Sequence, residues 1–285
     1  RLAGNNTYVG LTTVSTGTLV AAHANALGTT DAGTTVPGVA SLGTLIVAGV
    51  TVPEAITIAR GGVGAAGALQ GTGTAEVQGT VTMTANSSVG APNAGDTLTL
   101  SGQITATGNY SFTKFGAGTV VLSNTANNYT GVTTVMAGTL KLGASGVIPD
   151  GVNIGEVVVN APGKLDLAGH DETISGLQGN GTVDNGTGTG TYTLTVGAGN
   201  TDDTFSGVIQ NTSGTVNLTK IGSGTQTLAG ANAYTGRTLI SAGTLQLGAN
   251  NVLADGSLLE VNGAAATFNM AARTDTVAGV TLTDG

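Results

Sequence analysis

The chain of 285 residues has no cysteine and no tryptophan, and only 8% of its residues are charged. Without cysteine, neither a disulfide framework nor a thiolate metal site can form. The eight lysines and arginines are scattered and the net charge is −8. Nucleic-acid binding depends on clustered Lys and Arg, so the composition argues against a nucleic-acid partner. Five prolines, and glycines that do not recur at every third residue, exclude collagen.

Glycine and threonine dominate what is present, with 49 and 50 residues, about a third of the chain. Thr and Val fit pleated strands, whereas Gly weakens helices. Disordered chains combine low hydrophobicity with high net charge, but here 40% of residues are hydrophobic. The composition therefore predicts an all-β protein of many short strands. Alternating residues predict strands at Thr80–Thr84, Thr97–Leu100, Thr191–Val196 and Gly279–Thr283.

One uncharged segment, Ala32–Val52, is long enough to span a bilayer. Pro37, Pro53 and several Gly and Thr residues interrupt or close it. Its centre, Leu45–Val52, is strand-sized and β-branched. We therefore expect a buried strand here and no transmembrane span.

A motif centred on a tyrosine occurs three times, around Tyr8, Tyr129 and Tyr234. In each copy Gly falls two and nine residues after the Tyr, and Leu falls eleven after it. Copies two and three share a leader, Lys114–Thr119 and Lys220–Thr225, of the form Lys-x-Gly-x-Gly-Thr. Because such recurrence is the signature of stacked structural repeats, we expect the three tyrosines on one side of a repeat array.

Evenly spaced short strands suit a sandwich, a barrel or a β-solenoid. The glycine-rich linkers vary in length, whereas a meander favours tight two-residue turns. Equivalent motifs are separated by many strands, as in stacked rungs. The sequence thus predicts one continuous β-solenoid segment over 1–285, of about twelve rungs at 20–25 residues each. Its repeat motifs lie near 1–28, 114–151 and 220–256.

The segments Gly116–Gly143 and Gly222–Gly248 share the pattern Gly-x-Gly-Thr-x-x-Leu, then Asn, then Tyr-Thr-Gly and Gly-Thr-Leu-x-Leu-Gly. This pattern resembles the autotransporter-associated β-strand repeat, also called the passenger-associated transport repeat. The first copy departs from it at Val9, where the others have Thr. The resemblance implies a right-handed parallel β-helix, a passenger domain exported by type V secretion to a Gram-negative cell surface. It implies no catalytic residues.

Two sequence features bear on cofactor and metal chemistry. Gly62–Gly67 spells G-x-G-x-x-G after a strand-like stretch, but a dinucleotide site also needs a following helix, which Ala68–Thr74 will not form. His170-Asp171-Glu172, with Asp166 nearby, is the densest polar cluster and could hold a metal or act in acid–base chemistry. A single His beside two carboxylates is far more common at a solvated corner than in a site, and His23 stands alone. We therefore predict no cofactor and no metal site.

Calcium is the remaining metal to weigh. Asp202-Asp203 and Asp184-Asn185 offer the hard oxygen ligands that this ion prefers. The nonapeptide calcium repeat is absent, so incidental weak binding stays open beside a solvated turn.

The favoured function is that of a structural and adhesive extracellular β-helix of a bacterial surface protein or fibre, without catalytic residues. The alternative is a carbohydrate-active β-helix enzyme, a polysaccharide lyase or hydrolase. Hydrolases place paired carboxylates about 5–10 Å apart, and the 16 acidic residues here are spread along the chain. A Thr-x-Thr ice-binding face would need one motif per rung in register. Expected partners are further solenoid, from the same chain or a copy joined end to end into filaments, and a host-surface or carbohydrate receptor.

Overall fold

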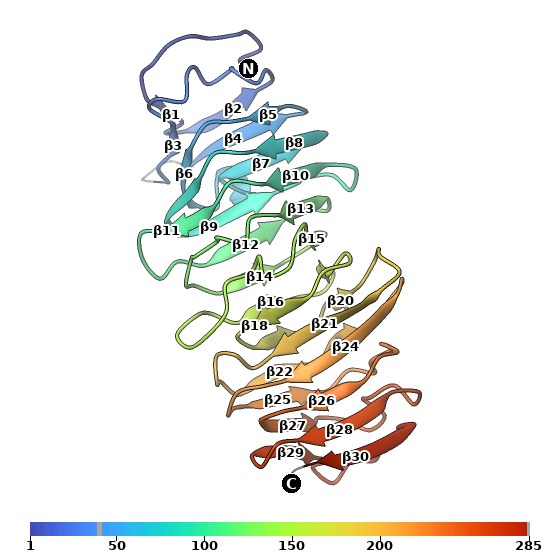
Figure 1. Cartoon of the computed structure of the whole chain (residues 1–285). Coiled ribbons are helices and arrows are strands. Elements are labelled where there is room, and N and C mark those ends of the chain that lie inside the picture. The colour runs from blue at the N-terminus through green and yellow to red at the C-terminus, as the bar shows by residue number, and fades with distance from the viewer. Residues whose placement is uncertain (39–41, 284–285) are drawn as a thin grey trace. The chain divides into compact units, whose positions relative to one another are not determined.

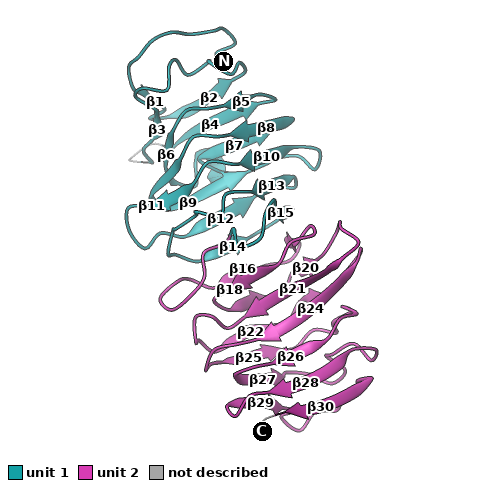
Figure 2. Ribbon diagram, in the orientation of Figure 1, with its two compact units in different colours: residues 1–147 teal, residues 148–285 magenta. Residues whose placement is uncertain are grey.

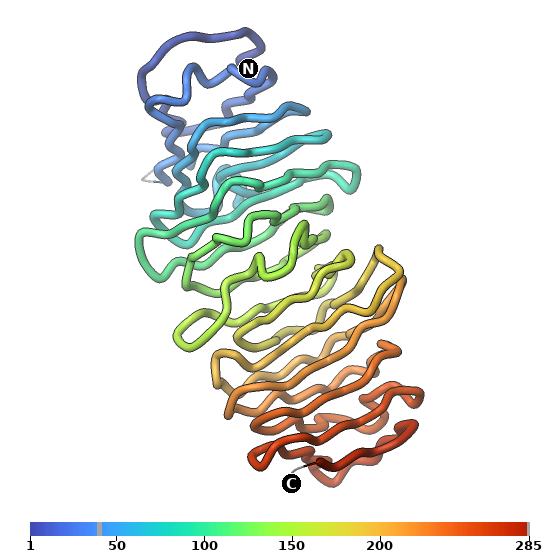
Figure 3. The backbone as a smooth tube through the Cα atoms, viewed as in Figure 1, coloured from blue at the N-terminus to red at the C-terminus, as the bar shows by residue number. Residues whose placement is uncertain are grey.

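The computed structural model describes residues 1–38 and 42–283, and these fall into two compact units, 1–147 and 148–285 (Figure 2). Both units are stacks of short parallel strands (Figures 1 and 3). Together they comprise about 12 turns of a β-solenoid, as the sequence predicts. The helical structure among the described residues is one 3-10 turn, Val63–Ala65.

Unit 1 forms three strand layers. The first runs in the order β1 (Thr12–Thr13), β3 (Thr34–Val36), β6 (Ile56–Arg60), β9 (Val81–Gly90), β12 (Phe112–Phe115) and β14 (Thr133–Val135), with β11 (Ile104–Ala106) also paired to β9. The second contains β2 (Gly17–Ala21), β4 (Gly43–Ala48) and β7 (Leu69–Thr72), and β7 also pairs with β9. The third contains β5 (Thr51–Val52), β8 (Thr74–Val77), β10 (Thr97–Leu100), β13 (Thr119–Leu122) and β15 (Thr139–Leu142).

Unit 2 repeats this three-layer arrangement. One layer is β16 (Val157–Val159), β19 (Leu177–Gly179), β22 (Asp203–Phe205), β25 (Thr225–Leu228), β27 (Gly243–Leu247) and β29 (Ala266–Asn269). Another is β17 (Lys164–Asp166), β20 (Thr182–Asp184) and β23 (Val208–Ile209). The last is β18 (Glu172–Ile174), β21 (Thr191–Val196), β24 (Thr215–Lys220), β26 (Thr238–Ile240), β28 (Leu258–Asn262) and β30 (Gly279–Thr283).

Period-two alternation decides which side chains face inward. In unit 1 the strands β10, β13 and β15 pair in register, so Leu98, Val120 and Leu140 form one buried ladder. Their neighbours along each strand are half-buried or outward-facing. Burying each such side chain contributes about 1.5–3 kcal/mol relative to leaving it exposed. The narrow core is thus built from stacked aliphatic side chains.

Three of the strands expected from sequence have the expected bounds, namely β10, β21 and β30. The stretch expected as Thr80–Thr84 becomes the ten-residue β9, which continues into a second set of pairings. The uncharged segment Ala32–Val52 contains β3, β4 and β5, and Leu45 is fully buried, which confirms the strand prediction for its described part. Residues 39–41 of that segment lie outside the described residues.

Candidate functional site

The repeated tyrosines make the same local contact in all three copies. Each hydroxyl forms a hydrogen bond with the hydroxyl of the threonine four residues later, which begins a strand. The pairs are Tyr8–Thr12 (2.8 Å), Tyr129–Thr133 (2.8 Å) and Tyr234–Thr238 (2.6 Å). The last two tyrosines are buried, and burial raises the pKa of Tyr234.

The expectation of a common side can be followed within unit 1. There, Tyr8 and Tyr129 precede strands of one layer, β1 and β14. Tyr8 is 40% exposed, whereas the ring of Tyr129 stacks on Phe112 at 5.8 Å between centroids. Tyr234 belongs to unit 2, where it precedes β26. The motif is therefore a corner brace that joins a turn to the strand after it.

The leader lysines occupy buried cages of backbone carbonyls. Lys114 in β12 is fully buried, and its ammonium donates to the carbonyl oxygens of Gly116 (2.6 Å), Gly118 (2.6 Å) and Ala137 (2.8 Å). Burial lowers the pKa of Lys114 to about 8. At neutral pH the side chain therefore keeps its proton and uses all three N–H groups as donors.

Lys220 repeats this arrangement in unit 2. Its ammonium donates to the carbonyls of Ile221 (2.5 Å), Gly222 (2.9 Å) and Ala242 (3.2 Å), and burial lowers its pKa. The Lys-x-Gly-x-Gly-Thr leader was visible in the sequence as a repeat. Its role was missed, although the alternation of Val216, Leu218 and Lys220 places the lysine on the inward face of its strand.

A glycine closes each cage because no side chain fits there. Gly138 (φ 61°) and Gly243 (φ 62°) adopt the left-handed conformation that glycine tolerates. A Cβ on Gly243 would lie 2.8 Å from Nζ of Lys220 and 2.6 Å from the carbonyl oxygen of Gly224. In these two copies the Ala-Gly of the Ala-Gly-Thr-Leu segment thus lies directly against the buried ammonium.

The carboxylates of the candidate cluster His170-Asp171-Glu172 do not converge on one site. Asp171 is exposed and accepts a hydrogen bond from the backbone N–H of Thr193 (2.7 Å). Glu172 is buried and accepts from the N–H of Ile148 (3.1 Å). Adjacent residues at a strand start point to opposite faces, which separates the carboxylates. His23 accepts a hydrogen bond on Nδ1 from the N–H of Asn25 (3.1 Å) in a separate turn.

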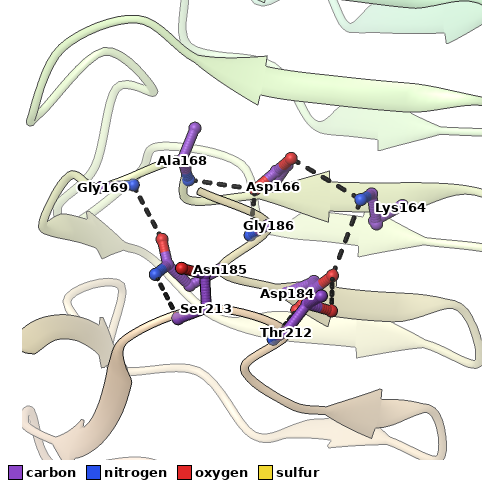
Figure 4. Close-up of polar contacts among 9 residues, drawn as sticks. All are labelled: Lys164, Asp166, Ala168, Gly169, Asp184, Asn185, Gly186, Thr212 and Ser213. Atoms are coloured by element: carbon purple, nitrogen blue, oxygen red, sulfur yellow. Dashed lines mark hydrogen bonds and ion pairs between the residues drawn. The ribbon is translucent and has the colours of Figure 1, made fainter. Parts of the chain in front are cut away.

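Asp166 and Asp184 do come together, because β17 and β20 pair them in register (Figure 4). Lys164 lies between their carboxylates, with its Nζ 3.6 Å from Oδ2 of each. Asp166 also accepts the backbone N–H groups of Ala168 (3.0 Å) and Gly186 (2.8 Å). The sequence placed Asp166 with His170 and Asp184 with Asn185, and it linked neither aspartate to the other or to Lys164.

The second half of the same cluster holds the following turn (Figure 4). Asp184 accepts both the N–H (2.8 Å) and the hydroxyl (2.9 Å) of Thr212. Fully buried Asn185 accepts the N–H of Gly169 (2.7 Å) and donates to the carbonyl of Ser213 (2.6 Å). Donors of the chain thus engage these oxygens, which are the atoms that a calcium ion would need.

The other aspartate pair also fastens neighbouring turns. Asp202 accepts the N–H of Thr225 (2.7 Å). Asp203 is buried and accepts from the Gln178 amide (2.6 Å) and the Thr201 hydroxyl (2.8 Å). No group of three or more His, Asp or Glu side chains in the described ranges 1–38 and 42–283 could hold a metal ion.

The Gly62–Gly67 stretch folds into a closed loop. Gly67 donates its N–H to the carbonyl of Gly61 (2.7 Å), and Val63 donates its N–H to the hydroxyl of Thr44 (2.8 Å). Strand β7 follows the loop, so the helix N-terminus of a dinucleotide site is missing at this place. Among the described residues, no helix is long and apolar enough to cross a membrane.

A comparison with known protein families finds repeats at the same three places as the tyrosine motifs. The passenger-associated-transport-repeat family matches residues 1–21, 112–142 and 218–247. The chain is 37% identical over 250 residues to the "Adhesin BmaC autotransporter" of Brucella suis biovar 1 (strain 1330), covering 86% of the chain. It is 32% identical over 89 residues, 31% of the chain, to the uncharacterized protein YuaQ of Escherichia coli (strain K12). In both cases the match spans 6% of the relative's length. No solved structure matches the chain.

Proposed function

Because the chain is an autotransporter passenger repeat protein, we propose that it is an adhesive and structural segment of a bacterial surface protein. The observation that carries this proposal is the likeness to an adhesin over 86% of the chain, on a solenoid whose corner polar groups are bound to one another. Such corners hold turns together. What remains for a partner is the outward surface of the strands.

That surface carries an ordered row of hydroxyl groups in unit 1. Strands β1, β3, β6, β9 and β11 pair in register, which aligns five threonines on successive turns, Thr13, Thr35, Thr57, Thr82 and Thr105. All five are exposed or half-buried. Solenoids present extended surfaces of this kind to their partners. An uncharged, hydroxyl-rich row suits polar partners such as glycans or extended peptides.

A non-catalytic role fits the acidic residues. The paired carboxylates of Asp166 and Asp184 are engaged by Lys164 and by backbone N–H groups. A general acid or base needs a proton that it can exchange with substrate. The competing proposal, a polysaccharide lyase or hydrolase, requires turnover of a polysaccharide that is abolished by Asp166→Asn or Asp171→Asn.

We place the protein at or outside the surface of a Gram-negative cell. The support is the likeness to an autotransporter, and protease treatment of intact cells tests it. Degradation of this segment without cell lysis supports surface display, and protection until lysis contradicts it.

Further solenoid is the partner that we propose for the last strands. Strand β30 pairs with β28, and its other edge has no partner among residues 1–38 and 42–283. Val280 and Leu282 on β30 are 59% and 74% exposed. An open apolar edge favours strand addition, by the same chain or by another copy in a filament. A stable monomer of the 285-residue chain at micromolar concentration, with β30 ordered, contradicts filament assembly.

Adhesion itself is tested by binding of the folded chain to cultured host cells. We expect saturable binding that excess unlabelled chain displaces. The matched control is the same chain unfolded by heat and cooled, which keeps composition and charge. Equal retention of the two preparations, or none of the folded chain, overturns the proposal.

A further inference from the structure

An open surface pocket of about 390 Å³ lies in unit 1, a size at the lower end of small-molecule sites. Its lining residues are Arg60, Ala85, Asn86, Asn109 and Tyr110. Arg60 ends β6, the next two lie midway along β9, and the last two belong to the loop between β11 and β12. None of these residues belongs to the Tyr or Lys motifs.

The pocket forms where the regular stack is broken. The start of β9 pairs with β11 and its end pairs with β12, and the register between β6 and β9 shifts between Ile58 and Arg60. Irregularities of this type bend a strand and re-aim its side chains, and they are frequent next to functional sites.

Arg60 is held in an unfavourable backbone conformation at this break. Its φ of 66° lies in the left-handed region, which glycine adopts readily and long side chains rarely do. The other seven described non-glycine residues with a positive φ are alanines and asparagines, so Arg60 is the one long, charged side chain in this conformation. Strained residues that persist tend to mark functional sites, so the retained side chain points to a use for it.

The lining offers hydrogen-bond donors and one positive charge. Arg60 is exposed, has no acidic partner among the described residues, and no carboxylate lines the pocket. Asn86 uses its Oδ1 to accept the N–H of Ser111 (3.0 Å), which leaves its NH₂ group as a donor. Asn109 accepts the Thr130 hydroxyl (3.4 Å) in the same way. This set fits a ligand with one anionic group and several oxygen acceptors.

Tyr110 supplies an apolar surface beside these donors. Its ring lies over Gly108, where a Cβ would be 3.2 Å from the ring carbon Cε2. A pyranose ring presents a face of C–H groups to an aromatic ring and hydroxyls to amides. A guanidinium binds a carboxylate through two parallel hydrogen bonds.

We propose that this pocket binds an acidic sugar, a pyranose that carries a carboxylate. In it, Arg60 binds the carboxylate, Asn86 and Asn109 bind hydroxyl or ring oxygens, and Tyr110 contacts the sugar face. The proposal rests on the adhesive function above and names the class of glycan that the adhesive surface recognises.

The test titrates the full chain with the methyl glycosides of glucuronic acid and of N-acetylneuraminic acid, followed by saturation-transfer NMR. The matched ligands are the same glycosides with the carboxylate converted to its amide. We expect saturable binding of at least one acid, at least tenfold weaker binding of its amide, and weakening by added salt. Absence of binding by both acids, or equal binding of acid and amide, overturns the proposal.

The decisive variant is Arg60→Gly, because glycine suits the backbone angle. We expect it to unfold at the same temperature or higher, yet to bind the acid at least tenfold more weakly. Arg60→Lys keeps the positive charge but not the forked geometry of the guanidinium, so its affinity should fall between those of the parent and of Arg60→Gly. Arg237→Ala removes an arginine that already pairs with Glu260 at 2.8 Å, and it should bind as the parent does. Undiminished binding by Arg60→Gly overturns the proposal.

Cell adhesion of Arg60→Gly separates the two proposals. If the parent chain and Arg60→Gly adhere equally, the pocket is not the adhesive site and the adhesive function stands. If the parent binds the acidic sugar but adheres to no cell, the sugar site stands and the adhesive function is wrong.

Discussion

Replacing Gly138 by alanine should be among the most damaging single changes in unit 1. Gly138 has a φ of 61°, and a Cβ there would overlap the carbonyl oxygens of Gly116 and Gly118 and Nζ of Lys114. These are atoms of the lysine cage, two of them backbone. Relief therefore requires the ammonium to leave its carbonyl partners or the turns to separate.

Two other glycines serve as controls that separate the cost of the positive φ from the cost of the steric overlap. Gly146 has a φ of 67° with open space around its Cβ position, and Gly95 has open space without a positive φ. An alanine in the left-handed conformation destabilises the folded state by about 1–2 kcal/mol. Replacing glycine also lowers the conformational entropy of the unfolded chain, which stabilises the folded state by about 0.4–1 kcal/mol. Gly146→Ala should thus cost about 1 kcal/mol, and Gly95→Ala should be neutral or slightly stabilising.

Gly138→Ala adds the loss of hydrogen bonds to a charged donor. Such bonds contribute about 1.5–3 kcal/mol each, so losing two of the three adds about 3–6 kcal/mol. The total of about 4–7 kcal/mol lies in the range that single mutations seldom reach. Gly138→Ala in a Lys114→Met background should cost less than the sum of the single changes, because both act on one cage.

Urea unfolding of the three alanine variants, followed by circular dichroism, measures these differences. Amide exchange in β12 to β15 reports whether the loss is local, as expected for a solenoid whose turns contact only their neighbours. If Gly138→Ala falls within 1 kcal/mol of Gly146→Ala, the cage contributes no stability and the reasoning is wrong.

Three further predictions concern the repeated tyrosines, the charge of Lys114 and the binding of calcium. Tyr129→Phe and Tyr234→Phe should each lower the free energy of unfolding by about 1–2 kcal/mol, because a buried hydrogen bond between two hydroxyls is lost. Tyr8→Phe, at a 40% exposed site, should change it by under about 0.5 kcal/mol. Equal losses for the three variants in urea unfolding would contradict this. The folded pKa of Lys114, about 8, lies below its value of 10.5 when unfolded, so the unfolded chain binds more protons between these values. The stability of the parent relative to Lys114→Met should therefore rise with pH from about 8 to 10.5, and a flat difference in unfolding free energy would refute it. Calcium should leave the melting temperature unchanged within 1 °C relative to chelator, because oxygens such as those of Asp184 already accept hydrogen bonds, and a calorimetric rise of several degrees would contradict this.

The all-β fold class and the bounds of several strands were predictable from the sequence, because both depend on the local alternation of residues. Thr97–Leu100 and Thr191–Val196 alternate without interruption, and each forms the predicted strand. β9 is longer than predicted, since Ala85 and Asn86 break the alternation yet stay extended between two different partners. The broken alternation shows where regular burial stops, but it does not show that two neighbouring turns keep the chain extended beyond that point.

The polar residues were harder to predict because their partners lie one turn away. Asp166 and Asp184 are 18 positions apart and meet only through the register of β17 with β20. Conversely, Asp171 and Glu172 are adjacent in sequence, but the alternation of side chains along a strand separates their carboxylates. Lys114 was recognised as part of a repeat, but its burial depends on three carbonyls, one of them 23 residues ahead.

These observations bear on where a repetitive protein can acquire specificity. In the repeated residues Lys114, Tyr129 and Gly138, the functional groups or the space around the Cα are already taken up by contacts within the stack, so each can change little without loosening it. The outward threonine row is regular, and a regular row offers every partner the same groups at every turn. A selective site needs a place where the repeat is interrupted and a side chain is left without an internal partner. In unit 1 the register shift at Arg60 is such a place, and the strained backbone there is stabilised by the turns around it.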